Sequence, residues 1–183
     1  MTATCPPADR RAAFALGANL GDRAAALRGA VRALAATNGI EVVAVSPPYE
    51  TDPVGGPAGQ SPYLNAVVVT HTRLPAAALL AAAHTVEDQY LRVRTRRWGP
   101  RTLDVDLLAV DAEVVTTPEL TIPHPRAHLR AFVLVPWADV DPGFEVPGHG
   151  RVADLLAELP AGERAGVRPA PAVGALDDDP GPA

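Results

Sequence analysis

The order of strand-like and helix-like segments is the feature of this sequence that most constrains its fold. Short runs rich in apolar and β-branched residues alternate with two longer stretches of helical periodicity. In chain order, the predicted elements are a strand at 12–17, a helix from Asp22 to about Asn38, strands at 40–46 and 63–72, a helix at 75–90 and a strand at 102–110. This order predicts an α+β fold in which the two long helices pack on one side of an antiparallel sheet.

The segments around these elements predict a single domain with one long loop. A chain of 183 residues suffices for one domain with a proper core, which we assign to residues 1–168, with the core at 12–160. Residues 47–62 hold five prolines and three glycines, which predicts a stretch without regular structure. A loop of this length in a compact domain is usually functional or disordered. From Pro169 the chain is rich in Pro, Ala and Gly, so residues 169–183 are predicted to be a disordered tail.

Shorter elements are predicted after the last strand. The segment AEVVT, which follows Asp111, is predicted to be the hairpin partner of the strand at 102–110, and residues 151–160 are predicted to form a short amphipathic helix. Between them, a Pro-His-Pro corner is followed by an apolar stretch that ends near Trp137. That stretch is compatible with either a helical turn or a strand.

Charge and composition restrict the possible ligands. The net charge of −5 argues against a general affinity for nucleic acid. Because the chain contains no lysine, a lysine-bearing phosphate loop is excluded, and a phosphate site must use guanidinium groups, backbone N–H groups and metal. Cys5 is the only cysteine, so neither a disulfide framework nor a zinc knuckle is available. No secretory leader and no apolar run near the roughly 18 residues of a membrane span is present, which predicts a cytoplasmic protein.

Two aspartates in the strand at 102–110 form a candidate metal site. Asp104 and Asp106 are two residues apart, so both carboxylates leave the same face of a strand whose other face is apolar. Such a pair repels unless a cation or arginines lie between the two groups. Mg²⁺ usually takes one or two protein carboxylates together with phosphate oxygens, which this pair satisfies. The alternative is a pair of surface aspartates that form salt bridges with Arg97 or Arg101.

Arginines are concentrated just before these aspartates. Five arginines lie within ten residues, at positions 92, 94, 96, 97 and 101. Together with metal they would neutralise the charge of a triphosphate. The alternative is a solvated charge run after a helix, which is as plausible for Arg96 as a functional role. Arg92 and Arg101, which bracket the segment, are the stronger candidates.

Two further groups suit a flat heterocycle and phosphate. Tyr63 and Asn65 share one face of their strand, where a ring can stack on a heterocycle and an amide can bind its edge. An incidental polar face on a half-exposed strand is the alternative. His124, Arg130 and Phe132, after the proline corner, add two phosphate donors and a second ring.

Taken together, these segments resemble the 6-hydroxymethyl-7,8-dihydropterin pyrophosphokinase family of folate biosynthesis. The resemblance covers about residues 12–160 and rests on "GANLGD", "ETDPVGG", "PYLNAVV", "RWGPRTLDVDLL" and "PHPRAHLRAFVLVP". It implies a ferredoxin-like βαββαβ core and transfer of the β,γ-pyrophosphoryl group of ATP to the hydroxymethyl oxygen of the pterin, with release of AMP. It also implies two Mg²⁺ ions and a monomer as the working unit.

The resemblance implies a role for each matching residue. Asp104 and Asp106 match the metal-binding aspartates, and Arg92 and Arg101 match arginines that act on the phosphates during catalysis. The pterin-binding residues that it implies are Thr51, Val54, Tyr63, Asn65 and Phe132. The ATP-binding residues that it implies are Arg92, Arg94, Arg97, Trp98, Arg101, Thr121, His124 and Arg130.

The sequence departs from the family pattern at three positions. Ala18 stands where the family commonly has serine, Leu91 where it often has glycine, and Thr95 where it often has a basic residue. We expect altered closure of the loops at 47–62 and 92–101 rather than lost chemistry. Glu87 also fits the pattern, in a supporting role.

Two other functions are compatible with parts of the sequence. A ferredoxin-like RNA-binding module would stack bases on aromatic rings, but the chain is acidic and has only eight aromatic residues. A metal-dependent phosphohydrolase would share the aspartate pair and would release phosphate or pyrophosphate without a pterin. The transferase accounts for more of the residues than either alternative.

Overall fold

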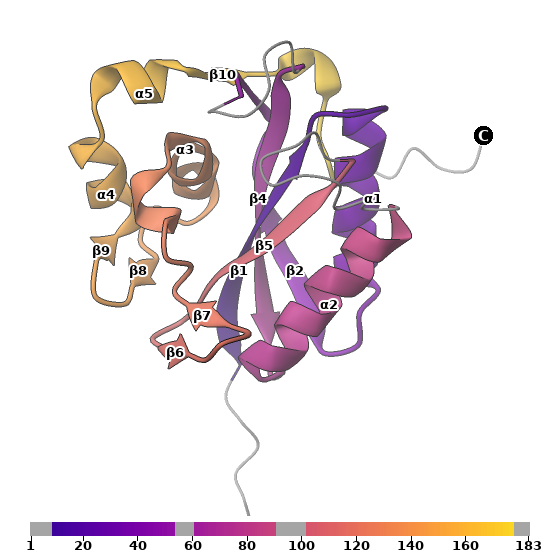
Figure 1. Cartoon of the computed structure of the whole chain (residues 1–183), viewed down its shortest axis with the longest axis vertical. Helices are drawn as coiled ribbons and strands as arrows, with labels where there is room; N and C mark the ends of the chain where they lie inside the picture. The colour runs from indigo at the N-terminus through magenta and orange to yellow at the C-terminus, as the bar shows by residue number, and fades with distance from the viewer. Residues whose placement is uncertain (1–8, 54–60, 91–101, 178–183) are drawn as a thin grey trace, which may run out of the picture.

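The fold is a six-stranded antiparallel sheet with helices on both faces (Figure 1). The computed structural model describes residues 9–53, 61–90 and 102–177. The strands of the sheet are β1 (Arg10–Ala18), β2 (Ile40–Val45), β3 (Tyr49–Thr51), β4 (Tyr63–Thr72), β5 (Asp104–Val110) and β10 (Val167–Pro169). Their order is β10-β3-β4-β1-β5, and β2 also pairs with β4. The predicted α+β class with an antiparallel sheet is confirmed. The ferredoxin-like assignment stays a prediction, because β3 and β10 add strands to that pattern.

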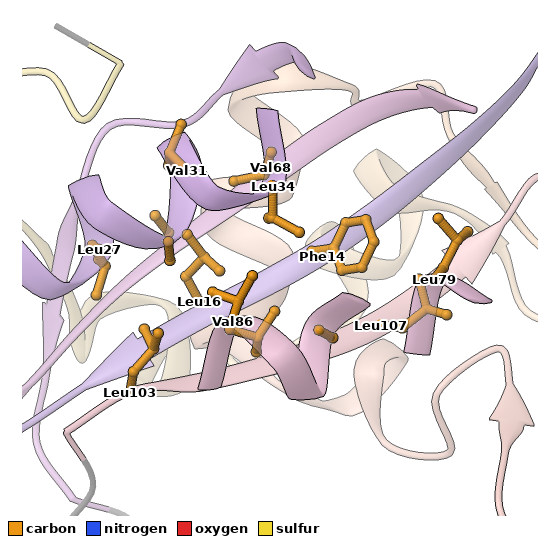
Figure 2. Packing of buried hydrophobic residues seen from close by; sticks show 14 of the residues in the cluster. Phe14, Leu16, Leu27, Val31, Leu34, Val68, Leu79, Val86, Leu103 and Leu107 are labelled. Atoms are coloured by element: carbon orange, nitrogen blue, oxygen red, sulfur yellow. The ribbon is translucent and has the colours of Figure 1, made fainter. Parts of the chain in front are cut away.

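The two long helices lie on one face of the sheet, as predicted. They are α1 (Arg23–Ala35) and α2 (Ala76–Gln89). The predicted cap is confirmed, because the side chain of Asp22 accepts a hydrogen bond from the Ala25 N–H at 2.9 Å. Figure 2 shows the core under these helices, where Phe14 and Leu16 of β1 lie among leucines and valines of the helices and the neighbouring strands.

The opposite face is also covered, which the prediction of helices on one side did not include. Here lie η1 (Ala127–Leu129), α3 (Ala131–Val140), the hairpin of β8 (Glu145–Val146) and β9 (Gly150–Arg151), and α4 (Val152–Glu158). Trp137 and Phe144 are fully buried and pack with Val67 of β4. The segment that ends near Trp137 is therefore helical. Its sequence is apolar on nearly every side, so periodicity could not distinguish a helix from a strand.

Two predictions about connecting segments were wrong. Residues 49–51 form β3, although the proline-rich stretch at 47–62 was predicted to lack regular structure. The segment AEVVT contributes β6 (Val115–Thr116), but β6 pairs with β7 (Thr121–Ile122) and not with β5. The helix predicted at 151–160 is confirmed as α4, and it is followed by α5 (Ala161–Ala165). In the described parts of the chain, no helix is long and apolar enough to cross a lipid bilayer.

The chain after Pro169 is packed as far as Asp177, contrary to the predicted disorder. β10 pairs with β3, and η2 (Pro171–Val173) follows it. Leu176 is only 2% exposed and belongs to the core beneath α1. The guanidinium of Arg28 in α1 donates to the carbonyl of Ala175 at 3.2 Å and also to that of Val173. One buried leucine and backbone pairing therefore order a segment whose composition is typical of disorder.

Candidate functional site

The sheet register places the predicted aspartates and the predicted amide on one face. Asp104 of β5 lies opposite Gly17 of β1, and Gly17 lies opposite Asn65 of β4. Asp106 lies opposite Ala15 in the next row of the same face. Because residues opposite one another project from the same side of a sheet, Asn65, Gly17 and Asp104 form one continuous row. The site is built on this row.

A buried hydrogen bond holds the amide of Asn65. Its Nδ2 donates to the Oγ1 of Thr51 in β3 at 2.8 Å, and both residues are buried. Tyr63 lies opposite Thr51 in the register and is half-buried. The Oδ1 of Asn65 faces Gly17, where a Cβ would stand 3.4 Å from that oxygen. Three of the predicted pterin-binding residues therefore lie together at the junction of β3 and β4.

The start of α3 borders the same face. Phe132 packs against the core that includes Val67, which projects from the same side of β4 as Asn65. The guanidinium carbon of Arg130 lies 5.4 Å from the centroid of the Phe132 ring, a distance suited to a cation–π contact. Both residues are half-buried, so the ring and the cation can also contact a ligand.

His124 lies close to Asp106, the second aspartate of the pair. Its backbone N–H donates to the Leu108 carbonyl of β5 at 2.7 Å, which fixes the proline corner against the strand. Burial lowers the pKa of His124, the charge of Asp106 opposes that shift, and the charges of Arg130 and Arg126 add to it. Asp106 and Arg130 therefore both lie close enough to His124 to act on it electrostatically.

A cavity of about 290 Å³ lies beside these groups. Asp106, Thr121 and His124 line it together with Glu87 of α2. Glu87 is 2% exposed and accepts a hydrogen bond from the Val105 N–H at 2.9 Å, which ties α2 to the strand that bears the aspartates. A larger hollow of about 520 Å³, around Arg11 and His149, contains none of the predicted site residues.

The two aspartates fit a hard divalent cation that takes most of its ligands from water and from substrate phosphate. Asp104 and Asp106 are both partly exposed and offer carboxylate oxygens from one strand face. Among the residues that the structure describes, no group of three or more His, Cys, Asp or Glu side chains gathers to enclose a metal. Mg²⁺ is typically bound in this open manner, by one or two carboxylates with water and substrate phosphate.

Six predicted site residues lie outside the described residues. They are Val54, Arg92, Arg94, Arg97, Trp98 and Arg101. Two of the three departures from the family pattern, Leu91 and Thr95, also lie there, together with Arg96. The roles of the arginine segment therefore stay predictions.

Two residues of the site were missed from the sequence. Gly17 separates the amide of Asn65 from Asp104, and a glycine inside a strand pattern is the signal that could have found it. Tyr49 of β3 donates to a carboxylate oxygen of Asp139 in α3. Burial, followed by this hydrogen bond and the charge of Asp139, raises the pKa of Tyr49 to about 12. The phenol stays protonated and joins β3 to α3, and no local pattern signals such a contact.

Comparison with known proteins assigns the family. The family described as 7,8-dihydro-6-hydroxymethylpterin-pyrophosphokinase (HPPK) matches residues 13–142, which include every predicted site residue. The chain belongs to this family. The resemblance inferred from the sequence motifs is therefore confirmed, and the chain is a pyrophosphokinase-family enzyme.

Several relatives that share one name cover most of the chain. Each is called 2-amino-4-hydroxy-6-hydroxymethyldihydropteridine pyrophosphokinase. The protein of Methylorubrum extorquens is 46% identical over 81% of this chain and 93% of its own length. The protein of Mycobacterium leprae is 47% identical over 86% of this chain and 87% of its own. The protein of Pseudomonas aeruginosa is 39% identical over 82% of this chain and 93% of its own.

Solved structures share the fold of this HPPK-family chain. A wild-type Plasmodium falciparum HPPK-DHPS crystal structure with pteroate matches 82% of the chain with a TM-score of 0.63 at 12% identity. The A437G form with pteroate matches 83% of the chain with a TM-score of 0.61 at 13% identity. This chain spans 44% and 43% of those two larger chains. At such low identity the likeness shows the fold alone.

Proposed function

We propose that this chain transfers the pyrophosphoryl group of ATP to the hydroxymethyl oxygen of 6-hydroxymethyl-7,8-dihydropterin, with release of AMP, in folate biosynthesis. Family membership and the shared name of relatives up to 47% identical support the reaction. The observation in the fold that carries it is the row of Asn65, Gly17 and Asp104. This row puts a group that suits a heterocycle edge beside a carboxylate that suits metal-bound phosphate.

Pterin recognition is assigned to the junction of β3 and β4. The hydroxyl of Thr51 accepts from Asn65 Nδ2, which fixes the orientation of the amide and directs its Oδ1 toward Gly17. In this orientation Oδ1 can accept a hydrogen bond from an N–H group of the pterin. The rings of Tyr63 and Phe132 supply stacking surfaces, and Val54 adds an apolar contact.

Phosphate recognition is assigned to the aspartate side of the row. Asp104 and Asp106 would hold two Mg²⁺ ions, which neutralise and orient the phosphates of ATP when bound. Arg130 and His124 border the same face and would donate to phosphate oxygens, and Thr121 would contact the nucleotide. The lowered pKa of His124 favours its neutral form, which still has one N–H to donate.

The chemistry requires alignment more than a side-chain base. The hydroxymethyl oxygen bonds to the β-phosphorus and its proton passes to solvent, while the bond from that phosphorus to the bridging oxygen of AMP breaks and AMP leaves with the electron pair. The chain binds both substrates in line on one rigid sheet face. Arg92 and Arg101 are proposed to stabilise the charge that builds on the phosphates, assisted by Arg94, Arg97 and Trp98 in ATP binding. We retain the predictions that one chain is the working unit and that it acts in the cytoplasm.

Nucleotide products test the proposal directly. ATP and Mg²⁺ are incubated with the protein, with and without 6-hydroxymethyl-7,8-dihydropterin, for wild type, Asp104→Ala and Asp154→Ala. Asp154 is an exposed aspartate in the first turn of α4 and serves as the matched control. We expect AMP only when pterin is present, with loss of AMP in Asp104→Ala and no loss in Asp154→Ala. ADP or phosphate formed without pterin would favour the phosphohydrolase, and salt-sensitive RNA binding without turnover would favour the binding module.

A further inference from the structure

Arg23, in the first turn of α1, contacts two segments that are distant from it in the sequence. Its NH2 group lies 2.8 Å from Oε1 of Glu50 in β3, and its NH1 group donates to the carbonyl of Pro62 at 2.8 Å. The forked guanidinium allows one side chain to bind both partners at once. We call this pair of contacts the Arg23 clasp.

Both partners of the Arg23 clasp adjoin proposed pterin-binding residues. Glu50 immediately precedes Thr51, whose hydroxyl accepts from Asn65. Pro62 immediately precedes Tyr63, which lies opposite Thr51 in the register of β3 and β4. Asn19, just before α1, donates to the carbonyl of Ser61 at 3.4 Å and adds a second contact to the segment that leads into Tyr63.

The Arg23 clasp should contribute little to the free energy of unfolding of the whole domain. The side chains of Arg23 and Glu50 are 29% and 36% exposed, and ion pairs with such access to water contribute little free energy. β3 is also held by β4, by β10 and by the bond from Tyr49 to Asp139. Removal of Arg23 therefore leaves β3 paired with β4 but releases the start of α1 from the two strand ends at Glu50 and Pro62.

We infer that Arg23 is a positioning residue for the pterin, because it holds the start of α1 against the strand end that carries Thr51 and the strand end that carries Tyr63. The inference rests on the proposed function. Arg23 itself need not touch either substrate. The aspartate pair lies on β5, two strands away from β4 in the sheet order, so ATP binding should not depend on the clasp.

The test separates pterin binding from ATP binding and from folding. Pterin affinity is measured by titrating 6-hydroxymethyl-7,8-dihydropterin fluorescence, and steady-state assays give KM for each substrate and kcat. The variants are Arg23→Ala, Glu50→Ala, the double variant, and Arg32→Ala. Arg32 is an exposed arginine in the last turn of the same helix and controls for the loss of one helical arginine.

We expect Arg23→Ala to raise the pterin Kd and KM about tenfold, since small misplacements of binding groups have effects of this size or larger. KM for ATP should stay within about twofold of wild type, and the midpoint of thermal unfolding should match that of Arg32→Ala within about 2 °C. The double variant should raise the pterin Kd by a factor smaller than the product of the two single-variant factors, because both single changes break the same contact.

Three other outcomes would contradict the inference, and one of them would also contradict the proposed function. A pterin Kd for Arg23→Ala equal to that of Arg32→Ala, with normal binding by wild type, overturns the inference and leaves the proposed function intact. An equal rise in KM for both substrates, or a large drop in the unfolding midpoint, shows a general structural role and also overturns it. No pterin binding by wild type refutes the proposed function and this inference with it.

Discussion

Replacing Thr51 with valine removes one hydrogen bond without changing the shape of the side chain. The Oγ1 of Thr51 accepts from Asn65 Nδ2 at 2.8 Å, and the two residues are 7% and 6% exposed. Valine offers a methyl group in place of the acceptor, so the buried N–H of Asn65 loses its partner. A buried donor without a partner costs about 1–3 kcal/mol of unfolding free energy. In a domain of this size, each kcal/mol lowers the unfolding midpoint by about 2–4 °C.

Thr70→Val is the matched control for this substitution. Thr70 lies in the same strand β4, is fully buried, and donates from Oγ1 to the Ala12 carbonyl at 3.2 Å. Its loss should cost about 0.5–1.5 kcal/mol, because a single neutral hydrogen bond disappears. Thr70 lies at the other end of the strand from Asn65. Both variants should therefore be less stable, and only Thr51→Val should bind pterin more weakly.

Thermal unfolding followed by circular dichroism gives the stability of each variant, and fluorescence titration gives its pterin Kd. We expect the unfolding midpoint of Thr51→Val to fall by about 2–12 °C and its pterin Kd to rise about tenfold as the amide of Asn65 loses its fixed orientation. An unchanged midpoint would contradict the buried hydrogen bond. An unchanged Kd with a lowered midpoint would contradict the claim that Thr51 orients Asn65 for the pterin.

Three further substitutions test other parts of the structure. Glu87→Ala should lower the urea-unfolding free energy by about 2–3 kcal/mol, because it removes the acceptor of the buried Val105 N–H, whereas Glu87→Gln, which keeps an acceptor, should lose less; equal losses would count against this contact. Leu176→Ala should cost about 2–4 kcal/mol in the same assay, and no cost would mean that this leucine is not part of the core. Burial, and then the charge of His149, lowers the pKa of His128, so the unfolded chain binds this proton more readily than the folded chain. Above the ordinary histidine pKa of about 6.5, His128 is neutral in both states and does not reduce the free energy of unfolding. As the pH falls from there through the lowered pKa, the free energy of unfolding decreases, so His128→Asn should flatten this part of the stability–pH profile.

The elements with strong local signals were the ones that the sequence predicted well. β4 begins and ends where it was predicted, at Tyr63 and Thr72, and Asp22 caps α1 as expected. β3 has no such signal, because its three residues lie in a proline-rich stretch and become a strand only by pairing with β4 and β10. The segment after Pro169 is ordered by the burial of Leu176 and by the hydrogen bonds from Arg28 to the carbonyls of Val173 and Ala175. In both cases the stabilising partners are distant in the sequence.

The site was predictable in pieces but not as an assembly. Strand alternation placed Asp104 with Asp106, and Tyr63 with Asn65, each pair on one face of its own strand. Their proximity depends on the sheet order, in which β1 lies between β4 and β5. The resemblance to known pyrophosphokinases supplied that proximity indirectly. Only the register shows that Gly17 is the residue between the two groups.

A substitution at Gly17 should change the activity of the protein without lowering its stability. A Cβ at this position would meet only Asn65 Oδ1, at 3.4 Å, so the fold can accept alanine, and its backbone has no left-handed conformation that requires glycine. Gly17→Ala should therefore leave the unfolding free energy unchanged or raise it by about 0.4–1 kcal/mol, since alanine restricts the unfolded chain. The new methyl group would stand between Asn65 and Asp104, where we propose that the hydroxymethyl group of the pterin approaches the phosphate, so kcat/KM should fall more than about tenfold. Gly143→Ala, which would meet nothing within 4 Å, is the control for a glycine replaced in open space. If Gly17→Ala is as active as Gly143→Ala at equal stability, the reacting groups do not meet across this row, and the proposed placement of the two substrates is wrong.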